Sequence, residues 1–229
     1  MVGLVDGGGW AERVPVPVER LAVLPEGVGF AEAAALPIAG LTALRALRVG
    51  GSLLGKRVLV NGASGGVGRF AVQLASRAGA HVAGVVGNPE RAGGLKELGA
   101  EELATNIEEL TGPFDLILES VGGTSLTTAL RLVGPDGTVV MFGNSSGESS
   151  EVAFGSIFSS PRANLYAFFV YESDDKRAFG EDLSLLVSMV ASGSLSSQVG
   201  FEASWRELGE AIVALRERRV GGKAVLRVE

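Results

Sequence analysis

The chain has 229 residues, of which 46 % are hydrophobic, and it carries a formal net charge of −6. This is enough apolar material for a sizeable core, and an acidic chain without a basic run is not expected to bind nucleic acid or an anionic membrane surface. Because the sequence holds no cysteine and one histidine, thiolate chemistry and a metal centre are not expected either. No apolar run has the length of a membrane span and no basic leader is visible, so we expect a cytoplasmic protein.

The first segment, residues 1–29, is predicted to contain short strands. Its β-favouring residues lie at 2–5, 11–14 and 16–23, where glycines and prolines interrupt them. These pieces have too few partners for a sheet of their own. Residues 32–49 then follow a helical pattern in which Pro37 forces a kink or a break.

Residues 57–68 form the most informative stretch, with the sequence Arg-Val-Leu-Val-Asn-Gly-Ala-Ser-Gly-Gly-Val-Gly. A β-favouring run leads into a glycine-rich turn and then into a helical pattern. Such a unit lets the backbone approach a bound diphosphate and points a helix N-terminus at it. The fingerprint G-x-G-x-x-G is matched with Ala63 in its first position, and a strand predicted at 81–86 follows the helix. We therefore predict a dinucleotide site, with a turn that only packs a helix on a sheet as the alternative.

Strands and helices continue to alternate after this unit. The predicted elements are a helix at 89–98, strands at 102–105 and 114–120, a helix at 124–133, a turn at 135–137, strands at 138–143 and 165–170, and a helix at 174–191. Six strands alternating with helices predict an α/β fold with a doubly wound parallel sheet of the Rossmann type. The tail is predicted to form a strand at 198–201, a helix at 204–218 opened by the capping box Ser204-x-x-Glu207, and a strand at 223–228. We expect this tail to rejoin the N-terminal strands.

The choice of cofactor depends on the residues after the second strand of the unit. NAD-binding proteins place an acidic residue about 20 positions past the glycine turn, where it binds the ribose 2′-hydroxyl. Here no acidic residue lies between Ala80 and Pro89, and Arg91 follows. An acidic side chain would repel a 2′-phosphate whereas an arginine binds one, so we predict NADP(H). An ordinary exposed helix residue is the alternative interpretation of Arg91.

Two stretches resemble the nucleotide-binding motifs of other protein classes, but in each case a residue that the class requires is absent. Residues 50–56 resemble a triphosphate-binding loop, but Arg57 stands where a magnesium-binding hydroxyl is needed, and the segment precedes a strand. The glycine turn also fits short-chain dehydrogenases, which need a lysine four positions after a tyrosine. Neither Tyr166 nor Tyr171 has one. We predict neither class.

Five motifs run in order through almost the whole chain: Asn61-Gly62-Ala63-Ser64-Gly65-Gly66-Val67-Gly68, Leu98-Gly99-Ala100, Glu119-Ser120-Val121-Gly122-Gly123, Phe142-Gly143-Asn144-Ser145-Ser146-Gly147 and Gly222-Lys223-Ala224-Val225. They resemble the zinc-independent medium-chain dehydrogenase/reductases, specifically the NADPH:quinone reductases of the zeta-crystallin type. The resemblance implies a Rossmann domain at 49–193, and a partial GroES-like, β-rich catalytic domain at 1–48 and 194–229, with NADPH between them. It also implies that a run of barrel strands, which precedes the equivalent of Met1 in the family and completes the substrate pocket, is missing here.

The resemblance further implies cofactor contacts, position by position. They are Thr42 at the nicotinamide; Ala63, Ser64, Gly65, Gly66 and Val67 at the diphosphate; Gly87, Asn88 and Arg91 at the 2′-phosphate; Asn106 at the adenosine; and Phe142, Gly143, Asn144, Ser145 and Lys223 at the nicotinamide pocket. The alternatives are a hydroxyl bonded to its own helix for Thr42, plain core for Phe142 and a solvated edge residue for Lys223.

The activity that the resemblance implies is hydride transfer from NADPH to a small apolar quinone or an activated alkene. A dry, shaped pocket supplies most of the effect in such a reaction and water can supply the proton, so we assign no catalytic residue. We expect the missing strands to impair turnover, and a catalytically inert chain that binds NADPH and self-associates is the alternative. The β-prone stretch at 165–170 is expected to be a sheet edge through which a homodimer forms.

Overall fold

The structure is a computed structural model, and it describes residues 1–152, 155, 160–172 and 177–228. The chain forms two compact units. Unit 1 comprises Met1–Thr42, Gly65–Phe70 and Asp174–Glu229, and unit 2 comprises Ala43–Ser64 and Ala71–Ser173. Both units draw on separate stretches of the sequence, whereas the sequence predicted one continuous domain at 49–193 and one divided domain at 1–48 and 194–229, and the predicted bounds and roles of these domains stay a prediction.

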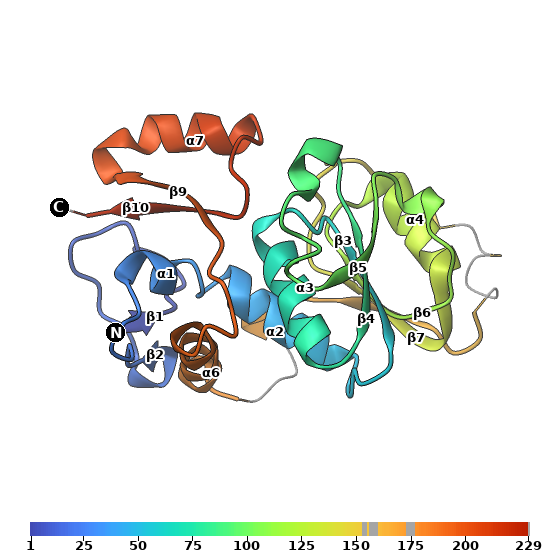
Figure 1. The fold of residues 1–229 in the computed structure, drawn as a ribbon, viewed down its shortest axis with the longest axis horizontal. Helices are drawn as coiled ribbons and strands as arrows, with labels where there is room; N and C mark the ends of the chain where they lie inside the picture. Colours follow the sequence, from blue (N-terminus) through green and yellow to red (C-terminus); the bar gives the residue numbers. More distant parts are fainter. Residues whose placement is uncertain (153–154, 156–159, 173–176, 229) are drawn as a thin grey trace. The chain divides into compact units, whose positions relative to one another are not determined.

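Unit 2 is built around a six-stranded sheet in which every neighbouring pair is parallel (Figure 1). The strand order is β5-β4-β3-β6-β7-β8, which is the order of doubly wound dinucleotide-binding folds. The prediction of that fold is thus confirmed. The strands are β3 (Arg57–Asn61), β4 (His81–Val85), β5 (Ala100–Ala104), β6 (Phe114–Glu119), β7 (Val133–Met141) and β8 (Asn164–Ala167).

The central strands are apolar because both faces of the sheet are covered. Val58 to Val60 of β3 and Leu116 to Leu118 of β6 have no exposed surface, as continuous hydrophobic runs in parallel sheets require. Helix α4 (Gly123–Leu132) covers one face, and its Leu126 and Ala129 join the same buried cluster as Leu59, Ile117 and Val139. Helix α2 (Ala39–Val49) and helix α3 (Gly66–Arg77) each begin in unit 1 and end in unit 2.

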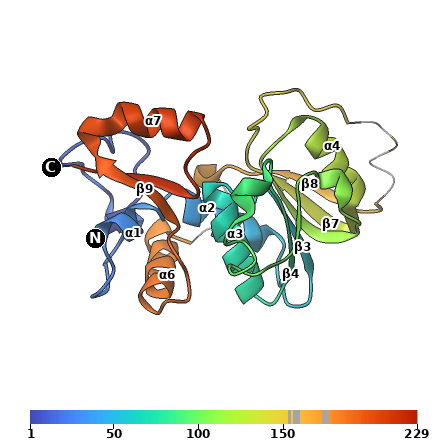
Figure 2. The same ribbon diagram turned by 45° about the horizontal axis from the view of Figure 1, so that its top comes forward.

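Unit 1 brings the two ends of the chain together. An antiparallel pair, β1 (Val2–Gly3) with β2 (Leu21–Ala22), comes from the N-terminal segment, and a parallel pair, β9 (Val199–Ser204) with β10 (Lys223–Arg227), comes from the tail. Helix α1 (Phe30–Ala34) contacts both tail strands, and α7 (Leu208–Arg216) lies along them (Figures 1 and 2). The tail thus returns to the N-terminal part of the chain through α1, but its two strands form a sheet of their own and do not pair with β1 or β2 as expected.

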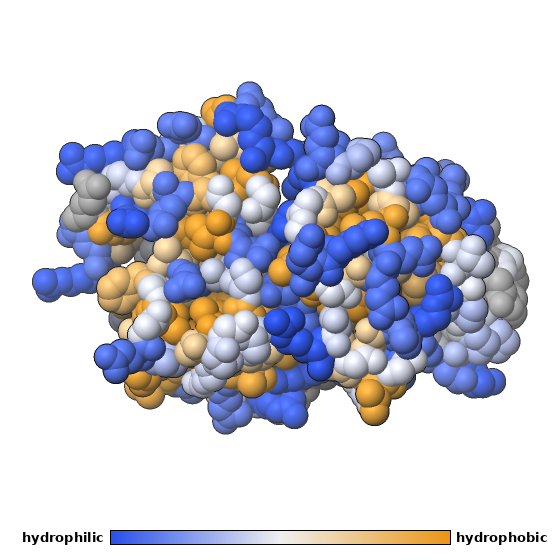
Figure 3. Space-filling view, viewed as in Figure 1, coloured by the Kyte–Doolittle hydropathy of each residue, from blue (hydrophilic) through white to orange (hydrophobic). Residues whose placement is uncertain are grey.

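Unit 1 exposes several large apolar side chains. Val18 and Phe30 are each 82 % exposed, and Trp10 and Val23 are each 70 % exposed. Figure 3, drawn in the view of Figure 1, shows hydrophobic residues at the surface of this unit. None of the helices in the described ranges combines the length and the apolar character that crossing a membrane demands.

Most predicted elements are present, with differences that have local causes. Pro37 separates α1 from α2 as expected, and Ser204 and Glu207 form the predicted capping box. Residues 11–14 form no strand, and the helix predicted at 89–98 is reduced to a short 3-10 helix, η2 (Pro89–Ala92), because Gly93 and Gly94 follow it.

Three further boundaries move. Strand β7 begins at Val133 and includes the predicted turn at 135–137. Its pairing with β6 continues past this turn with a shift in register, so the strand does not end there. Strand β8 ends at Ala167, and residues 170–172 form a 3-10 helix. The helix predicted from residue 174 is α6 (Phe179–Ala191), and residues 173–176 lie outside the described ranges.

Two glycines in helices of unit 1 test the packing of this unit. A Cβ at Gly180 of α6 would overlap the carbonyl oxygen of Leu21 and lie 2.9 Å from that of Glu19, whereas a Cβ at Gly209 of α7 would meet nothing within 4 Å. Gly180→Ala is therefore expected to lower the free energy of unfolding by about 1–3 kcal/mol through overpacking. Gly209→Ala, the matched control, is expected to raise it by about 0.5–1 kcal/mol because alanine favours helix. Urea unfolding of both variants checks this, and a neutral Gly180→Ala would contradict the close approach.

Candidate functional site

The turn after β3 is held by the neighbouring strand. The N–H groups of Gly62 and Ala63 both donate to the carbonyl oxygen of Val85 at the end of β4, at 3.1 and 2.9 Å. Gly62 has φ of 85°, and a Cβ there would lie 2.5 Å from the hydroxyl oxygen of Ser120. A glycine is needed at this position for its positive φ and for the close approach of the loop after β6.

Helix α3 begins directly after this turn, at Gly66. Ala63 and Ser64 are buried, while Gly65, Gly66 and Val67 remain partly accessible. The first hydrogen bond of the helix runs from the N–H of Arg69 to the carbonyl of Gly65, at 3.0 Å. The N–H groups of a helix's first turn have no acceptor inside the helix and can bind an anion, so residues 65–67 have the local geometry predicted for a diphosphate contact.

A cleft of about 250 Å³ lies at the carboxyl ends of β3, β4 and β5. Two of the predicted cofactor residues, Gly87 and Asn106, line it together with the turn residues Asn61 and Gly62. The side-chain oxygen of Asn106 accepts the N–H of Glu108 at 3.1 Å, and so caps the short helix η3 (Ile107–Glu109). The remaining walls come from residues that the sequence argument did not select, namely Val85, Thr105, Ile107, Glu108, Val121, Thr124, Ser125 and Thr128.

The three residues predicted for a 2′-phosphate are close in sequence and lie around η2. Asn88 is its N-cap, and its side-chain oxygen accepts the N–H of Glu90 at 2.9 Å. Arg91 lies within this 3-10 helix and is partly buried, which differs from the fully exposed helix residue of the alternative interpretation. The side-chain oxygen of Asn88 thus has a structural partner, and the cationic group of the cluster is Arg91.

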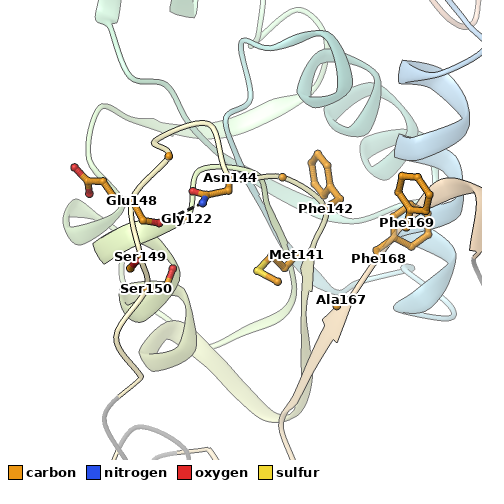
Figure 4. A pocket seen from close by; sticks show the side chains of 12 residues that line it. Gly122, Met141, Phe142, Asn144, Glu148, Ser149, Ser150, Ala167, Phe168 and Phe169 are labelled. Atoms are coloured by element: carbon orange, nitrogen blue, oxygen red, sulfur yellow. Dashed lines mark hydrogen bonds between the residues drawn. The ribbon is translucent and has the colours of Figure 1, made fainter.

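A second cleft, of about 630 Å³, opens between the ends of β7 and β8. Three predicted residues, Phe142, Gly143 and Asn144, line it, and Figure 4 shows Phe168 and Phe169 on the same side of the cleft as Phe142. Met141, Ala167, Phe168 and Phe169 were not selected from the sequence. The signal for Ala167, Phe168 and Phe169 was the apolar stretch that follows residue 164, which was interpreted only as a sheet edge, and Met141 lies in the strand predicted at 138–143.

The loop after β7 holds itself together by polar contacts. The side-chain amide of Asn144 donates to the carbonyl of Glu148 at 3.2 Å, and its oxygen accepts the hydroxyl of Ser146 at 3.1 Å. Ser145 is not among the residues lining the cleft. Its N–H donates to the carbonyl of Ser120 at 3.0 Å, so its backbone joins this loop to the one that follows β6.

Thr42 and Lys223 belong to unit 1 and line neither of these two clefts. Thr42 is buried in α2. Lys223 opens β10 beside the start of α3: a Cβ on Gly66 would lie 2.9 Å from its Cδ and 3.7 Å from its Nζ. Burial lowers the pKa of the Lys223 ammonium group. The structure therefore places this cation at the N-terminus of α3, the end expected to face a diphosphate.

A buried carboxylate, also missed by the sequence argument, joins the loops around the first cleft. Glu119 at the end of β6 accepts the N–H groups of Val121 and Gly122 and the side-chain amide of Asn61. Within the described ranges, no group of three or more histidine, aspartate or glutamate side chains could hold a metal ion.

These features define a class of protein: an α/β dinucleotide-binding fold whose glycine turn lies where the strand order reverses. Comparison with known proteins identifies the family. The family model described as zinc-binding dehydrogenase matches residues 66–188. The quinone oxidoreductase of Pseudomonas aeruginosa is 30 % identical over 236 residues, which cover 96 % of this chain and 71 % of that protein. Prostaglandin reductase-3 of Bos taurus is 29 % identical, over 99 % of this chain and 66 % of its own length.

A solved structure agrees with these relatives. The quinone oxidoreductase of Thermus thermophilus, studied alone and in complex with NADPH, aligns with a TM-score of 0.78 and 30 % identity, over 99 % of this chain and 76 % of that one. The chain therefore belongs to the zinc-binding dehydrogenase family, in the branch of medium-chain dehydrogenase/reductases that contains the quinone oxidoreductases. It spans about two thirds to three quarters of the length of the three relatives named.

The requirement for glycine at position 62 gives the first prediction from the site. Gly62→Ala is expected to lower the free energy of unfolding by about 1.5–3.5 kcal/mol, because a positive φ costs about 1–2 kcal/mol and turning the Ser120 hydroxyl away breaks its hydrogen bond to the main-chain carbonyl of Asn61, about 0.5–1.5 kcal/mol. Gly51, with φ of 69° and no neighbour within 4 Å, is the control. Gly51→Ala is expected to show only the backbone term, about 1–2 kcal/mol. If urea unfolding gives the same loss of free energy for Gly62→Ala and Gly51→Ala, the contact between the turn after β3 and the loop after β6 is contradicted.

The lowered pKa of Lys223 predicts a pH dependence of stability. Burial disfavours the ammonium form, so between the lowered pKa of the folded chain and the ordinary lysine pKa of 10.5 the unfolded chain holds more protons and stability rises with pH. Lys223→Met is therefore expected to be more stable than the original chain at neutral pH, and this advantage is expected to shrink as the pH approaches 10.5. Urea unfolding across this range measures it, with the exposed Lys96→Met as the control. A difference independent of pH would contradict the prediction.

Proposed function

We propose that this chain binds NADP(H) and transfers a hydride from it to a small apolar quinone or an activated alkene. The observation that carries the proposal is the turn from Gly62 to Gly66, which is fixed on the carbonyl of Val85 and leads into the N-terminus of α3. Because β3 lies between β4 and β6 in the sheet, the turn occupies the position where such folds bind dinucleotides. Family membership supports the same conclusion.

The residues present fit the cofactor. Only a residue without a side chain is compatible with the φ and the close neighbour at Gly62, so the backbone of the turn stays open to a diphosphate. The diphosphate would be held by Ala63, Ser64, Gly65, Gly66 and Val67, and the Lys223 ammonium group lies beside Gly66. The adenosine would lie against Gly87 and Asn106, whose cleft also contains Asn61. When bound, the nicotinamide supplies the hydride.

Selectivity for NADP(H) is proposed to come from Arg91. A guanidinium group binds a phosphate through several charge-assisted hydrogen bonds, whereas the 2′-hydroxyl of NADH offers no charge. Asn88 positions η2 through its cap, and so positions Arg91 within it. Glu90 lies in the same short helix, and its carboxylate is within 3.5 Å of the side-chain nitrogen of Asn88.

The larger cleft of unit 2 is proposed to hold the nicotinamide end and part of the hydride acceptor. Phe142 and Phe168 give it apolar walls, and Phe169 is 59 % exposed at its rim. Flat apolar rings pack favourably against aromatic side chains, so a quinone or a conjugated enone fits these walls. An apolar cleft also excludes water from the hydride. No side chain is assigned as proton donor, and water is proposed to fill that role.

A second candidate is binding of NADPH without turnover. The apolar side chains that unit 1 leaves exposed favour it, with Val18 and Phe30 each 82 % exposed, because a substrate pocket needs more enclosing walls than an open apolar surface supplies. Under this candidate the nucleotide cleft is intact and the acceptor is not held.

Self-association through β8 is part of the same proposal. This strand is the last of the sheet, beyond β7, and Leu165 on it is 47 % exposed. A strand at a sheet edge presents unpaired N–H and carbonyl groups, and an identical strand related by a twofold axis can pair with it.

Titration with NADPH, combined with a turnover assay, tests the proposed function. The purified chain is expected to enhance NADPH fluorescence with an affinity of about 1 μM to 1 mM, and to bind NADH about tenfold or more weakly for lack of the phosphate. Saturable oxidation of NADPH by 1,4-benzoquinone would support the reductase, and binding without oxidation would support the second candidate. Absence of NADPH binding would contradict both.

A further inference from the structure

The carboxylate of Glu119 is the most deeply buried charged group at the nucleotide cleft, with no exposed surface. One of its oxygens accepts the N–H of Val121 at 2.5 Å and that of Gly122 at 3.0 Å. The other accepts the side-chain amide of Asn61 at 2.6 Å. Such a group is costly to bury without partners, and here three N–H groups supply them.

The contacts of Asn61 extend this network across the site. Its side-chain nitrogen also donates to the hydroxyl of Ser125 in the first turn of α4, at 2.5 Å. The main-chain carbonyl oxygen of Asn61 accepts the hydroxyl of Ser120 at 2.9 Å. The end of β3, the loop after β6 and the start of α4 are therefore joined through one buried carboxylate and one buried amide.

Glu119 does not line the cleft, but two of its three hydrogen-bond partners, Asn61 and Val121, do. Asn61, Val121 and Ser125 are all lining residues, as is Gly62, which follows Asn61 directly. The loop at 120–122 approaches Gly62 so closely that a Cβ on that glycine would lie 2.5 Å from the Ser120 hydroxyl oxygen. The two walls are thus in contact, and the carboxylate ties together the backbone segments that form them.

We propose that Glu119 is a positioning residue, whose carboxylate sets the separation and orientation of the turn after β3 and the loop after β6, and so shapes the cleft for the cofactor. The inference rests on the proposed NADP(H) binding for its functional meaning. Its physical basis is the loss that follows removal of the carboxylate: the N–H groups of Val121 and Gly122 and the side-chain amide of Asn61 would each lose an acceptor, and the loop would move to find water.

The test compares two substitutions at Glu119 with a control on the same strand. Glu119→Leu removes both acceptor oxygens, whereas Glu119→Gln keeps one for the N–H groups of Val121 and Gly122. Asp115→Leu is the control, because Asp115 accepts the N–H of Arg57 at 2.8 Å at the opposite end of β6. Hydrogen–deuterium exchange is measured on the ligand-free proteins, and the affinity for NADPH is measured by fluorescence.

Peptides covering 61–64 and 120–122 are expected to exchange about tenfold faster or more in Glu119→Leu, and its affinity for NADPH is expected to fall by about tenfold or more. Glu119→Gln is expected to stay within about threefold of the original chain in both measurements, since its oxygen still accepts the two main-chain N–H groups and its NH2 group can donate to the Asn61 side-chain oxygen once that amide turns over. Asp115→Leu is expected to match the original chain at this end of the sheet. A uniform loss of stability would not produce this local pattern.

Unchanged exchange in both peptides of Glu119→Leu, or NADPH affinity within twofold of the original, would overturn the inference. If Glu119→Leu does not fold, Asn61→Ala replaces it. That change cuts the link between β3 and the carboxylate while Val121 and Gly122 keep their acceptor. It is expected to accelerate exchange at 61–64, and unchanged exchange there would overturn the inference. An original chain that fails to bind NADPH contradicts the proposed function, whereas the ligand-free exchange comparison still decides the role of Glu119.

Discussion

The site depends on the place of β3 in the sheet. Its neighbours are β4 on one side and β6 on the other. The strands that follow β3 in the chain are therefore added first on the β4 side and then on the β6 side. In such folds a crevice opens at the carboxyl end of the strand where this change of side occurs. The turn at Gly62 is anchored to one neighbour by the carbonyl of Val85 and held close to the other by Ser120. The turn is therefore presented at the carboxyl edge of the sheet, and the proposed recognition of the cofactor relies on main-chain groups.

This dependence on backbone explains why so much of the fold was predictable from the sequence. Strand, turn and helix at 57–68 follow from local rules: a β-favouring run, glycines where φ is positive, and apolar residues on one helical face. The repetition of such units fixes a parallel sheet, since each crossover must return along the same direction. The sequence was less informative where two local tendencies compete. At 135–137 a turn signal lies inside a strand that continues through a register shift, and at 93–94 two glycines end a helix that the apolar pattern would extend.

The parts of the site that sequence reasoning missed are pairings over long distances in the chain. Asn61 and Glu119 are 58 residues apart, and Asn61 and Ser125 are 64 apart. Both Asn61 and Glu119 end β-favouring runs, and nothing local marks their side chains as partners. Only the adjacency of β3 and β6 brings them together. Phe168 and Phe169 were missed for a related reason: an apolar run at the end of an edge strand has the same sequence whether it faces a cleft or a second subunit.

Lys223 adds a cation at the start of α3 within unit 1. Both residues of this contact, Gly66 and Lys223, belong to that unit, and a Cβ on Gly66 would lie 2.9 Å from the Cδ of Lys223. Burial lowers the pKa of this ammonium group, and under the proposed function a bound diphosphate would favour its charged form again. The proposed binding would therefore favour the packing of β10 against the start of α3, and so would give the tail strand a part in it.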